Sequence, residues 1–179
     1  MKLGYLGPRG TFTEAALRSL AISTDAELVA YPTVTAALDA ARSGEVYASL
    51  VPLENSVEGS VSQTLDELAS GEPLVIIDEA AINVEFSLMA RPGTKLEDVR
   101  LVTTHPHAHA QCRNWLATAI PDARVVPALS TAAAAEEVSD PASRFDAAIS
   151  ANIAAEHYGL DVLAHGIGDN SFAKTRFVL

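Results

Sequence analysis

The hydrophobic and polar positions of the chain follow two different periods in turn. Short apolar runs rich in Val, Leu and Ile indicate strands, and alanine-rich stretches with apolar residues at helical spacing indicate helices. Strands are expected at residues 2–6, 27–31, 48–53, 74–77, 83–90, 100–103, 124–127, 147–150 and 176–179. Helices are expected at residues 13–20, 34–43, 61–70, 106–118, 131–138 and 152–158. This alternation predicts an α/β fold with mostly parallel sheets, in which ligands bind where strands lead into helices.

The pattern changes between residues 79 and 90, where one strand follows another without a helix between them. Apolar side chains at Val84, Phe86 and Leu88 alternate with polar ones, as expected of a strand with two different faces. We interpret this segment as a crossover into a second lobe. Lobe 1 is then expected to comprise residues 1–77 and 165–179, and lobe 2 residues 78–164.

Composition narrows the class of protein. The 179 residues, 49% of them hydrophobic, suit one large domain or two small lobes. With 12 basic against 23 acidic residues and a net charge of −11, a nucleic-acid surface is not expected. The apolar runs are too short to span a membrane and the N-terminus lacks a secretory signal, so we expect a soluble, cytoplasmic protein. Cys112 is the only cysteine, which excludes an intrachain disulfide, and it is predicted to be a buried helix residue.

Four turns carry residue types that commonly begin a helix. The candidates are Thr11 or Thr13, Asn55 or Ser56, His105 followed by Pro106, and Ser130 or Thr131. A helix start offers unpaired N–H groups and a partial positive charge, so these turns could hold carboxylates in an acidic protein. Each of them equally suits ordinary helix capping.

Polar residues follow the third predicted strand. Glu54 could move a proton if burial raises its pKa, or could orient other donors, while Asn55 can both donate and accept hydrogen bonds. A helix cap with a solvated Glu54 is the alternative.

Further along, His105 and His109 could share a helix face, but no carboxylate or further His has metal-ligand spacing, so no metal site is expected. Gln111 points differently from His105 and could serve as a neutral donor.

The triplet Thr175-Arg176-Phe177 joins a hydroxyl, a cation and a ring at a predicted strand start. An aliphatic hydroxyl is a weak acid, so Thr175 suits a reaction that needs little proton transfer. On a strand, Thr175 and Phe177 project to one side and Arg176 to the other. Thr175 is therefore predicted to face the site, and Arg176 either binds a substrate carboxylate or forms a structural ion pair.

Together these motifs resemble the catalytic domain of prephenate dehydratase over nearly the whole chain. The matching segments are Gly7-Pro8-Arg9-Gly10-Thr11-Phe12, Val51-Pro52-Leu53-Glu54-Asn55-Ser56, His105-Pro106 with Gln111-Cys112, Ser130-Thr131-Ala132-Ala133-Ala134, and Asp169-Asn170 before Thr175-Arg176-Phe177. The resemblance implies a two-lobed fold like that of type II periplasmic binding proteins, with the active site in a cleft between the lobes. It also implies decarboxylative dehydration of prephenate to phenylpyruvate in phenylalanine biosynthesis, without a metal or organic cofactor.

The resemblance assigns roles to individual residues. Thr175 takes the place of the catalytic threonine that donates to the departing hydroxyl, and Glu54, Asn55 and Gln111 fall on further catalytic positions. The positions expected to contact substrate are Thr11, Phe12, Ser56, Ser130, Thr131, Asn170 and Arg176. Prephenate is the expected small-molecule partner, and a homodimer is the form expected if the chain self-associates.

Three positions depart from the family pattern. Ala173 stands where many members have an asparagine two residues before the catalytic threonine, although Asn170 fits another common asparagine position. His107 stands where glutamine is frequent. Members usually continue beyond the position of Leu179 into an ACT regulatory domain that binds phenylalanine. That domain is absent from this sequence, which is either an excised catalytic domain or a chain without that regulation.

Two other functions remain compatible with these residues. A prephenate decarboxylase would release carbon dioxide and keep the ring hydroxyl, which would leave an intact Thr175 without a purpose. A module that binds a small anion without chemistry would also suit a two-lobed fold. The Glu54, Asn55 and Thr175 set favours the dehydratase over both.

Overall fold

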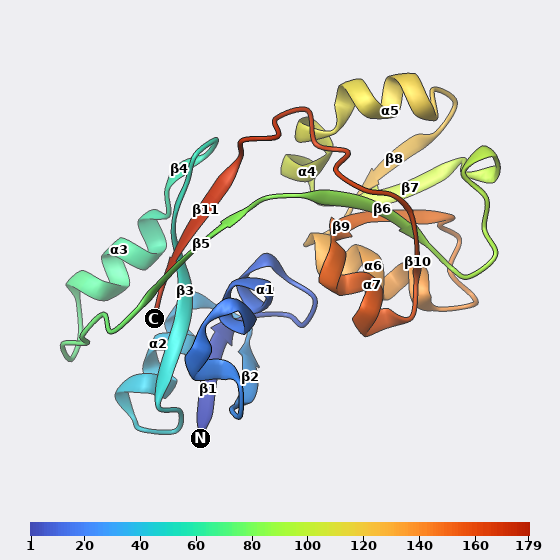
Figure 1. Ribbon diagram of the computed structural model, residues 1–179. Helices are drawn as coiled ribbons and strands as arrows, with labels where there is room; N and C mark the ends of the chain where they lie inside the picture. Colours follow the sequence, from blue (N-terminus) through green and yellow to red (C-terminus); the bar gives the residue numbers. More distant parts are fainter. The chain divides into compact units, whose positions relative to one another are not determined.

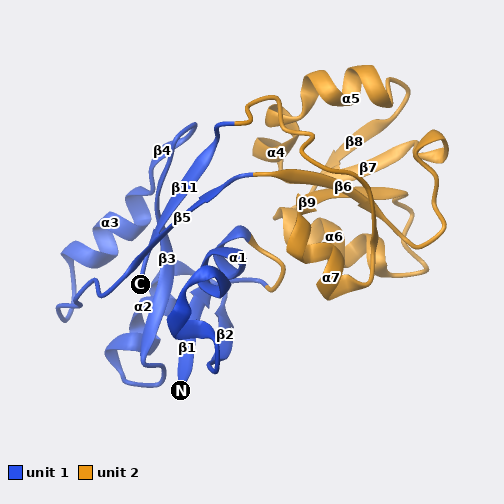
Figure 2. Cartoon of the chain, in the orientation of Figure 1, with its two compact units in different colours: residues 1–8, 12–84, 172–179 blue, residues 9–11, 85–171 orange.

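The computed structural model describes residues 1–179, which divide into two contact units (Figure 2). Unit 1 contains residues 1–8, 12–84 and 172–179, and unit 2 contains residues 9–11 and 85–171. The chain builds most of unit 1, passes into unit 2 after residue 84, and returns to unit 1 after residue 171. Both chain ends therefore belong to unit 1 (Figure 1).

Unit 1 is a mixed sheet flanked by helices, with the strand order β2-β1-β3-β11-β5 and with β4 paired to β3. Its strands are β1 (Lys2–Leu6), β2 (Glu27–Tyr31), β3 (Ala48–Asn55), β4 (Gly59–Ser60), β5 (Glu79–Asn83) and β11 (Lys174–Val178). Its helices are α1 (Phe12–Ser19), α2 (Val34–Arg42) and α3 (Ser62–Ala69), with a short 3-10 turn at Ala21–Ser23. β1 runs parallel to β2 and β3, whereas β11 runs antiparallel to β3 and β5.

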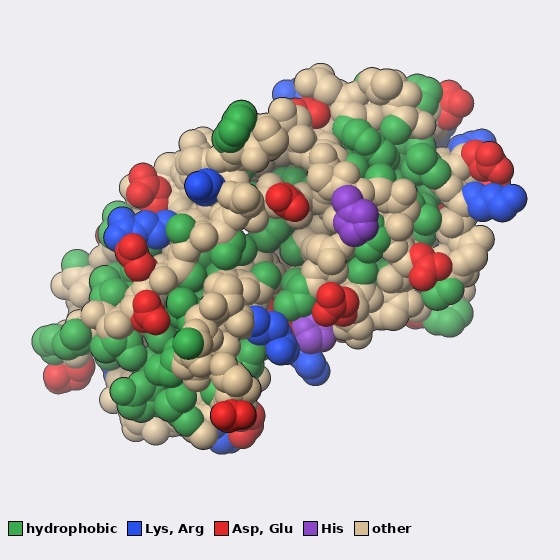
Figure 3. All heavy atoms as spheres, viewed as in Figure 1, with side chains coloured by type: hydrophobic (Ala, Val, Ile, Leu, Met, Phe, Trp, Pro, Cys, Tyr) green, Lys and Arg blue, Asp and Glu red, His purple; other side chains and the backbone are tan.

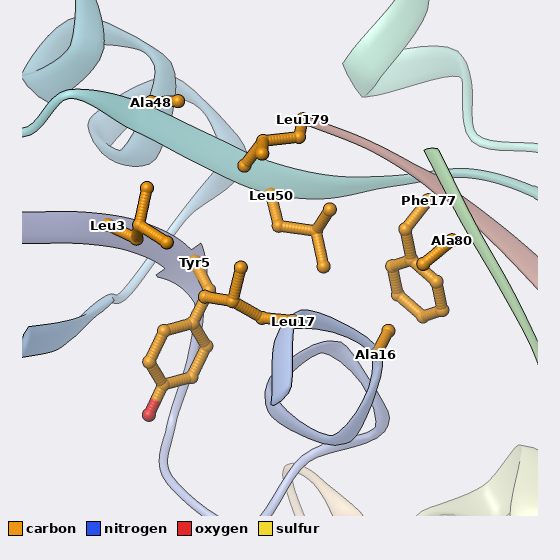
Figure 4. Close-up of a cluster of buried hydrophobic side chains, with 9 residues drawn as sticks. All are labelled: Leu3, Tyr5, Ala16, Leu17, Ala48, Leu50, Ala80, Phe177 and Leu179. Atoms are coloured by element: carbon orange, nitrogen blue, oxygen red, sulfur yellow. The ribbon is translucent and has the colours of Figure 1, made fainter. Parts of the chain in front are cut away.

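Along the central strands of unit 1, successive side chains pack on opposite faces of the sheet. Leu50 and Phe177 pack with Leu17 of α1 in one hydrophobic cluster (Figure 4). Val51 and Val178, the next residues along each strand, pack in a second cluster with residues of α2. Since successive strand side chains point to opposite faces, α1 and α2 cover opposite faces of the sheet. Burial on both faces explains why these strands are continuously apolar in the sequence.

Unit 2 is a second mixed sheet, with the strand order β10-β6-β9-β7-β8. Its strands are β6 (Phe86–Ala90), β7 (Leu101–Thr104), β8 (Arg124–Pro127), β9 (Ala147–Ala151) and β10 (Asp161–Ala164). Its helices are α4 (Pro106–Gln111), α5 (Arg113–Ala119), α6 (Thr131–Ser139) and α7 (Asn152–Tyr158), with a short 3-10 turn at Leu96–Asp98. Alanines of α6 and α7 pack on Met89 and Ala148 of the sheet, so the helices approach it closely.

The α/β class expected from the sequence is confirmed, but the sheets are mixed rather than mostly parallel. The strands β6 and β11 enter their sheets by crossing from one unit to the other instead of following a helix, and each pairs antiparallel with its neighbours. Parallel neighbours need a crossover connection between them, so a strand that enters its sheet directly from the other unit can run antiparallel to its neighbours.

Unit boundaries fall at residues 84/85 and 171/172, later than the expected 77/78 and 164/165. Residues 79–83 form β5, which pairs with β11 and so stays in unit 1. Residues 165–171 stay in unit 2 because the Ile167 N–H donates to the Phe86 carbonyl (3.0 Å) and the Asp169 N–H donates to the Gln111 carbonyl (2.6 Å).

Two predicted elements are wrong, and the strand β5 is missing from the prediction. Residues 74–77 form no strand, and Val75 is 80% exposed. The expected strand at residues 83–90 corresponds to β6, whereas β5 comes before it, belongs to the other sheet and is not among the predicted strands. The expected helix at residues 106–118 is interrupted at Cys112 (φ −121°, ψ 10°), which separates α4 from α5. The short strands β4 and β10 carry no sequence signal strong enough to predict them.

Arg42 joins the ends of α2 and α3. Its guanidinium donates to the carbonyl oxygens of Glu67 (2.6 Å), Ser70 (3.1 Å) and Glu72 (3.1 Å), which lie at and beyond the end of α3. The same group forms ion pairs with Asp39 (2.9 Å) and Glu67 (3.5 Å), and its side chain is only 13% exposed. The carbonyls that end a helix lack partners within it, so Arg42 supplies the last turn of α3 with donors from another element.

We expect the substitution Arg42→Met to lower the free energy of unfolding by about 2 to 3 kcal/mol, because several hydrogen bonds from a charged, mostly buried group are lost together. Urea denaturation followed by circular dichroism measures this change. The matched control is Arg124→Met, at an exposed position of β8, which should stay within about 0.5 kcal/mol of the wild type. An equal effect of both substitutions would contradict the role of Arg42.

Cys112 is fully buried, as the sequence predicts. It lies near the Asp169 carboxylate, which caps the start of α5. The Asp169 side chain accepts from the backbone N–H groups of Asn114 (3.1 Å) and Trp115 (3.4 Å) at the start of α5. Burial, and then the negative charge of Asp169, raise the pKa of the Cys112 thiol to about 12. The thiol is therefore neutral and shielded near neutral pH.

Because the reactive form is the thiolate, a pKa near 12 instead of 9 makes Cys112 about 10³-fold less reactive at pH 8 than an ordinary thiol. Labelling by a thiol-specific disulfide reagent should be very slow in the native protein and fast in denaturant. Asp169→Asn keeps an oxygen for the two backbone donors and removes the charge, so it should speed native labelling modestly. Fast labelling of the native wild type would contradict this account.

Candidate functional site

A hydrogen bond between Asn55 and Thr175 joins the two motifs singled out in the sequence. The Asn55 Nδ2 donates to the Thr175 Oγ1 at 2.7 Å, and Thr175 is only 8% exposed. The Asn55 Oδ1 accepts from the backbone N–H groups of Val57 (2.8 Å) and Glu58 (3.0 Å). These two donors settle which end of the amide faces Thr175, since only the nitrogen end remains for it. The Thr175 oxygen is thus an acceptor in this bond, and its own proton is available to another oxygen.

A β-bulge in β3 brings Asn55 to the face that carries Thr175. Along β11, Arg176 pairs with Glu54 but Phe177 pairs with Pro52, so Leu53 is an extra residue in β3. The pairing of β11 with β5 on its other side is regular, which locates the irregularity in β3. One extra residue reverses the alternation of faces beyond it. Without the bulge, Asn55 would share the face of Val51, opposite Thr175.

Ser56 fastens the start of β11 with both its backbone and its side chain. The Lys174 N–H donates to the Ser56 Oγ at 2.9 Å, and the Ser56 N–H donates to the Lys174 carbonyl at 2.9 Å. The two bonds continue the β3–β11 ladder past Asn55. They hold Thr175, the next residue of β11, in place opposite Asn55.

Glu54 and Arg176 lie on the other face of the two strands. Arg176 Nε donates to the Glu79 Oε2 at 2.9 Å, and its Nη2 forms a second short bond to the same oxygen. Both partners are about half exposed, so this is a surface ion pair that contributes little to stability. Glu54 is exposed and pairs across the ladder with Arg176, not with Thr175. Of the two alternatives for Arg176, the ion pair is the one observed in unit 1.

The remaining predicted residues, except Phe12, belong to unit 2. Ser130 caps α6, because its Oγ accepts from the Ala133 N–H at 2.9 Å, and Thr131 begins the helix. His105 caps α4 through its Nδ1, which accepts from the His107 N–H at 3.3 Å, with Pro106 in the first helical position. Both helix starts are confirmed. Gln111 ends α4, and its carbonyl accepts the Asp169 N–H beside Asn170.

Two other helix starts differ from expectation. Thr11 precedes α1, which begins at Phe12, while Thr13 is buried inside the helix. Asn55 and Ser56 cap no helix, because β3 turns into β4 and α3 begins only at Ser62 without a side-chain cap. The Asn55 side chain instead closes the turn toward β4, a role that asparagine commonly takes next to its own backbone.

The structural roles of three residues cannot be recognised from the sequence, although Leu53 and Asp169 lie within the family motifs. Leu53 is an ordinary apolar residue until its pairing partners are known, so the bulge is invisible. Glu79 reaches Arg176 across 97 residues, and Asp169 reaches the start of α5 across about 55. Long-range contacts of this kind leave no local pattern.

Metal ligands, membrane-spanning helices and cavities are the other features that bear on the kind of site. No group of three or more His, Cys, Asp or Glu side chains could hold a metal ion. No helix is both long enough and apolar enough to cross a membrane. A cavity of about 270 Å³ in unit 1 is lined mostly by apolar residues of α2, β3, α3, the segment 74–77 and the last two residues of the chain, and by none of the predicted site residues. Hydrophobic side chains gather on the surface of this part of unit 1 (Figure 3).

Comparison with known proteins identifies the family. A family model described as prephenate dehydratase matches residues 3–179. A prephenate dehydratase of Amycolatopsis methanolica is 52% identical over 178 residues, which is 99% of this chain and 57% of that protein. The crystal structure of an Arthrobacter aurescens prephenate dehydratase in complex with L-Phe superposes with a TM-score of 0.93 at 46% identity, over 99% of this chain and 58% of that one.

A more distant structure carries a different description. A protein described as a novel type of quorum-quenching acylase matches with a TM-score of 0.85 at 28% identity, over 99% of this chain and 63% of that one. The chain thus spans about three fifths of the length of the relatives it matches. The family model covers nearly every residue, including the Asn55 and Thr175 motifs. The chain belongs to the prephenate dehydratase family.

Proposed function

We propose that this chain catalyses the decarboxylative dehydration of prephenate to phenylpyruvate, carbon dioxide and water. The observation that carries the proposal is the Thr175 hydroxyl, whose oxygen accepts from Asn55 while its proton is available to a departing group. Family membership supports the same reaction, because the family model and the 52% identical relative are both described as prephenate dehydratase.

The reaction requires little from the protein beyond orientation and one proton. As the ring carboxylate leaves as carbon dioxide, the electrons of its carbon–carbon bond enter the ring, and the carbon–oxygen bond of the ring hydroxyl breaks. The departing hydroxide takes the Thr175 proton and leaves as water. The N–H of Asn55 stabilises the negative charge that develops on the Thr175 oxygen until solvent returns a proton. Because aromatisation drives these steps, a weak acid such as threonine suffices.

The other predicted residues receive secondary roles in this proposal. Gln111 serves as a neutral donor, and the substrate contacts are assigned to Thr11, Phe12, Ser130, Thr131 and Asn170. Ser56 supports Thr175 by holding the start of β11. We propose no substrate contact for Glu54 or Arg176, because they project from the opposite face and Arg176 is engaged with Glu79.

Incubation with prephenate and identification of the product tests the proposal, with a blank that contains no protein. Phenylpyruvate, with equimolar carbon dioxide, is the expected result. A non-aromatic hydroxy acid would instead identify a decarboxylase, and tight binding of prephenate without product would identify a binding module. A parallel incubation with N-acyl amides tests the acylase activity named in the description of the 28% identical relative. Hydrolysis of the amide bond without turnover of prephenate would overturn the proposal.

Replacement of the hydroxyl alone tests the role of Thr175. Thr175→Val keeps the branched shape and removes the proton donor, so kcat should fall about 10²-fold or more. Thr175→Ser, which restores a hydroxyl, should recover much of that loss. The control Thr118→Val removes the hydroxyl of an exposed threonine in α5 and should leave kcat unchanged. Normal turnover by Thr175→Val would remove Thr175 from the mechanism.

The substitution Asn55→Asp distinguishes a role of Asn55 in catalysis from a role in stabilising the turn alone. The carboxylate still accepts from the Val57 and Glu58 N–H groups but no longer donates to Thr175. Thr175 would then donate its own proton to the carboxylate, so we expect kcat to fall by about 10- to 10²-fold with little change in thermal stability. Turnover measurements beside thermal unfolding check this. A large loss of stability with an unchanged kcat would show that Asn55 serves the turn alone.

A further inference from the structure

The loop Arg9–Thr11 packs with unit 2, although the segments on both sides of it belong to unit 1 (Figure 2). In the sequence this loop connects β1 to α1. Its contacts, however, are with α7, which comes more than 140 residues later. Residues of α7 therefore hold the loop in place.

Gly10 lies directly on the surface of α7. It is buried and has φ +81°, a conformation that favours glycine. A Cβ at this position would lie 3.2 Å from both the Cα and the Cβ of Ala154, and 3.3 Å from the Cε2 of Tyr158. The close approach is possible because Gly10 has no side chain and Ala154 has only a methyl group.

A hydrogen bond fixes the loop one residue earlier. The Tyr158 hydroxyl donates to the Arg9 carbonyl at 3.2 Å. This distance is long for an O–H donor, so the bond alone contributes modestly. The Tyr158 ring, which also borders Gly10, adds a packing contact to it.

The helix that carries these contacts is itself held firmly. Ala154 and Ala155 are buried in the core of unit 2, and Tyr158 packs against the same cluster. Gly159 ends the helix in the left-handed conformation (φ +65°), with its N–H donating to the Ala155 carbonyl. The contacts at Arg9 and Gly10 therefore hold the loop against a firmly packed helix.

We propose that α7, through Ala154 and Tyr158, positions this loop and so determines where the Thr11 hydroxyl lies for substrate binding. Tyr158 is then a positioning residue that acts through Thr11. The inference rests on the proposed function, in which Thr11 contacts prephenate. Since Thr11 follows Gly10 directly, a loop released from α7 would displace its hydroxyl and weaken binding, while the Thr175 and Asn55 pair would be unaffected.

The first test combines kinetics with hydrogen exchange. In Tyr158→Phe, which keeps the ring, the KM for prephenate should rise about threefold, as loss of one weak hydrogen bond implies, with kcat within about twofold of the wild type. In Tyr158→Leu, which also loses the ring contact, KM should rise about 10-fold. Amide exchange in residues 9–12 should become faster in both variants. The control Tyr47→Phe, at a tyrosine that is 64% exposed, should change none of these quantities.

A double-mutant cycle shows whether Tyr158 acts through Thr11. Thr11→Val should raise KM by itself, and Tyr158→Leu should add little to it, because the hydroxyl that Tyr158 positions is already gone. Fully additive effects, or loop exchange unchanged in Tyr158→Leu, would overturn the inference. Absence of phenylpyruvate formation by the wild type would overturn the proposed function and the substrate role of the loop with it. The exchange measurement would then report on the positioning alone.

Discussion

The antiparallel insertion of β11 between β3 and β5 is the constraint on which the rest of unit 1 depends. Both neighbours of β11 come from the first half of the chain, so the sheet is complete only when residues 174–178 have returned to it. Phe177 and Val178 then complete the clusters on the two faces of the sheet. Thr175 lies on this same strand, so the residue proposed to carry the chemistry is fixed by the pairing that completes the core.

A single extra residue in β3 decides which polar side chains meet. The bulge at Leu53 places Asn55 on the face of Thr175 and leaves Glu54 beside Arg176 on the other face. Asn55 is then held from three directions, by two backbone donors at its oxygen and by Thr175 at its nitrogen. A preorganised donor of this kind requires no rearrangement when charge develops on the threonine oxygen. The same bulge explains why Arg176 joins a surface ion pair.

In unit 2, the arrangement depends on small residues and on helix ends. Alanines in α6 and α7 allow the helices to lie close to the sheet, and Ala154 allows the loop at Gly10 to lie close to α7. Ser130, His105 and the distant Asp169 supply acceptors to the first N–H groups of three helices. Polar residues at these helix starts therefore stabilise the helices, in addition to any contact with a ligand.

The sequence by itself determined the α/β class, most helices and strands, the buried state of Cys112, the helix starts at His105 and Ser130, and the motifs of the family. These features depend on neighbouring residues, whose periodicity and capping chemistry are readable locally. Only the tertiary structure decided that residues 74–77 stay outside the sheet, that the strands cross between units at residue 84, and that Asn55 rather than Glu54 meets Thr175. Each of these outcomes depends on a partner far away in the chain, and a shift of one residue in pairing reverses the face on which a side chain lies.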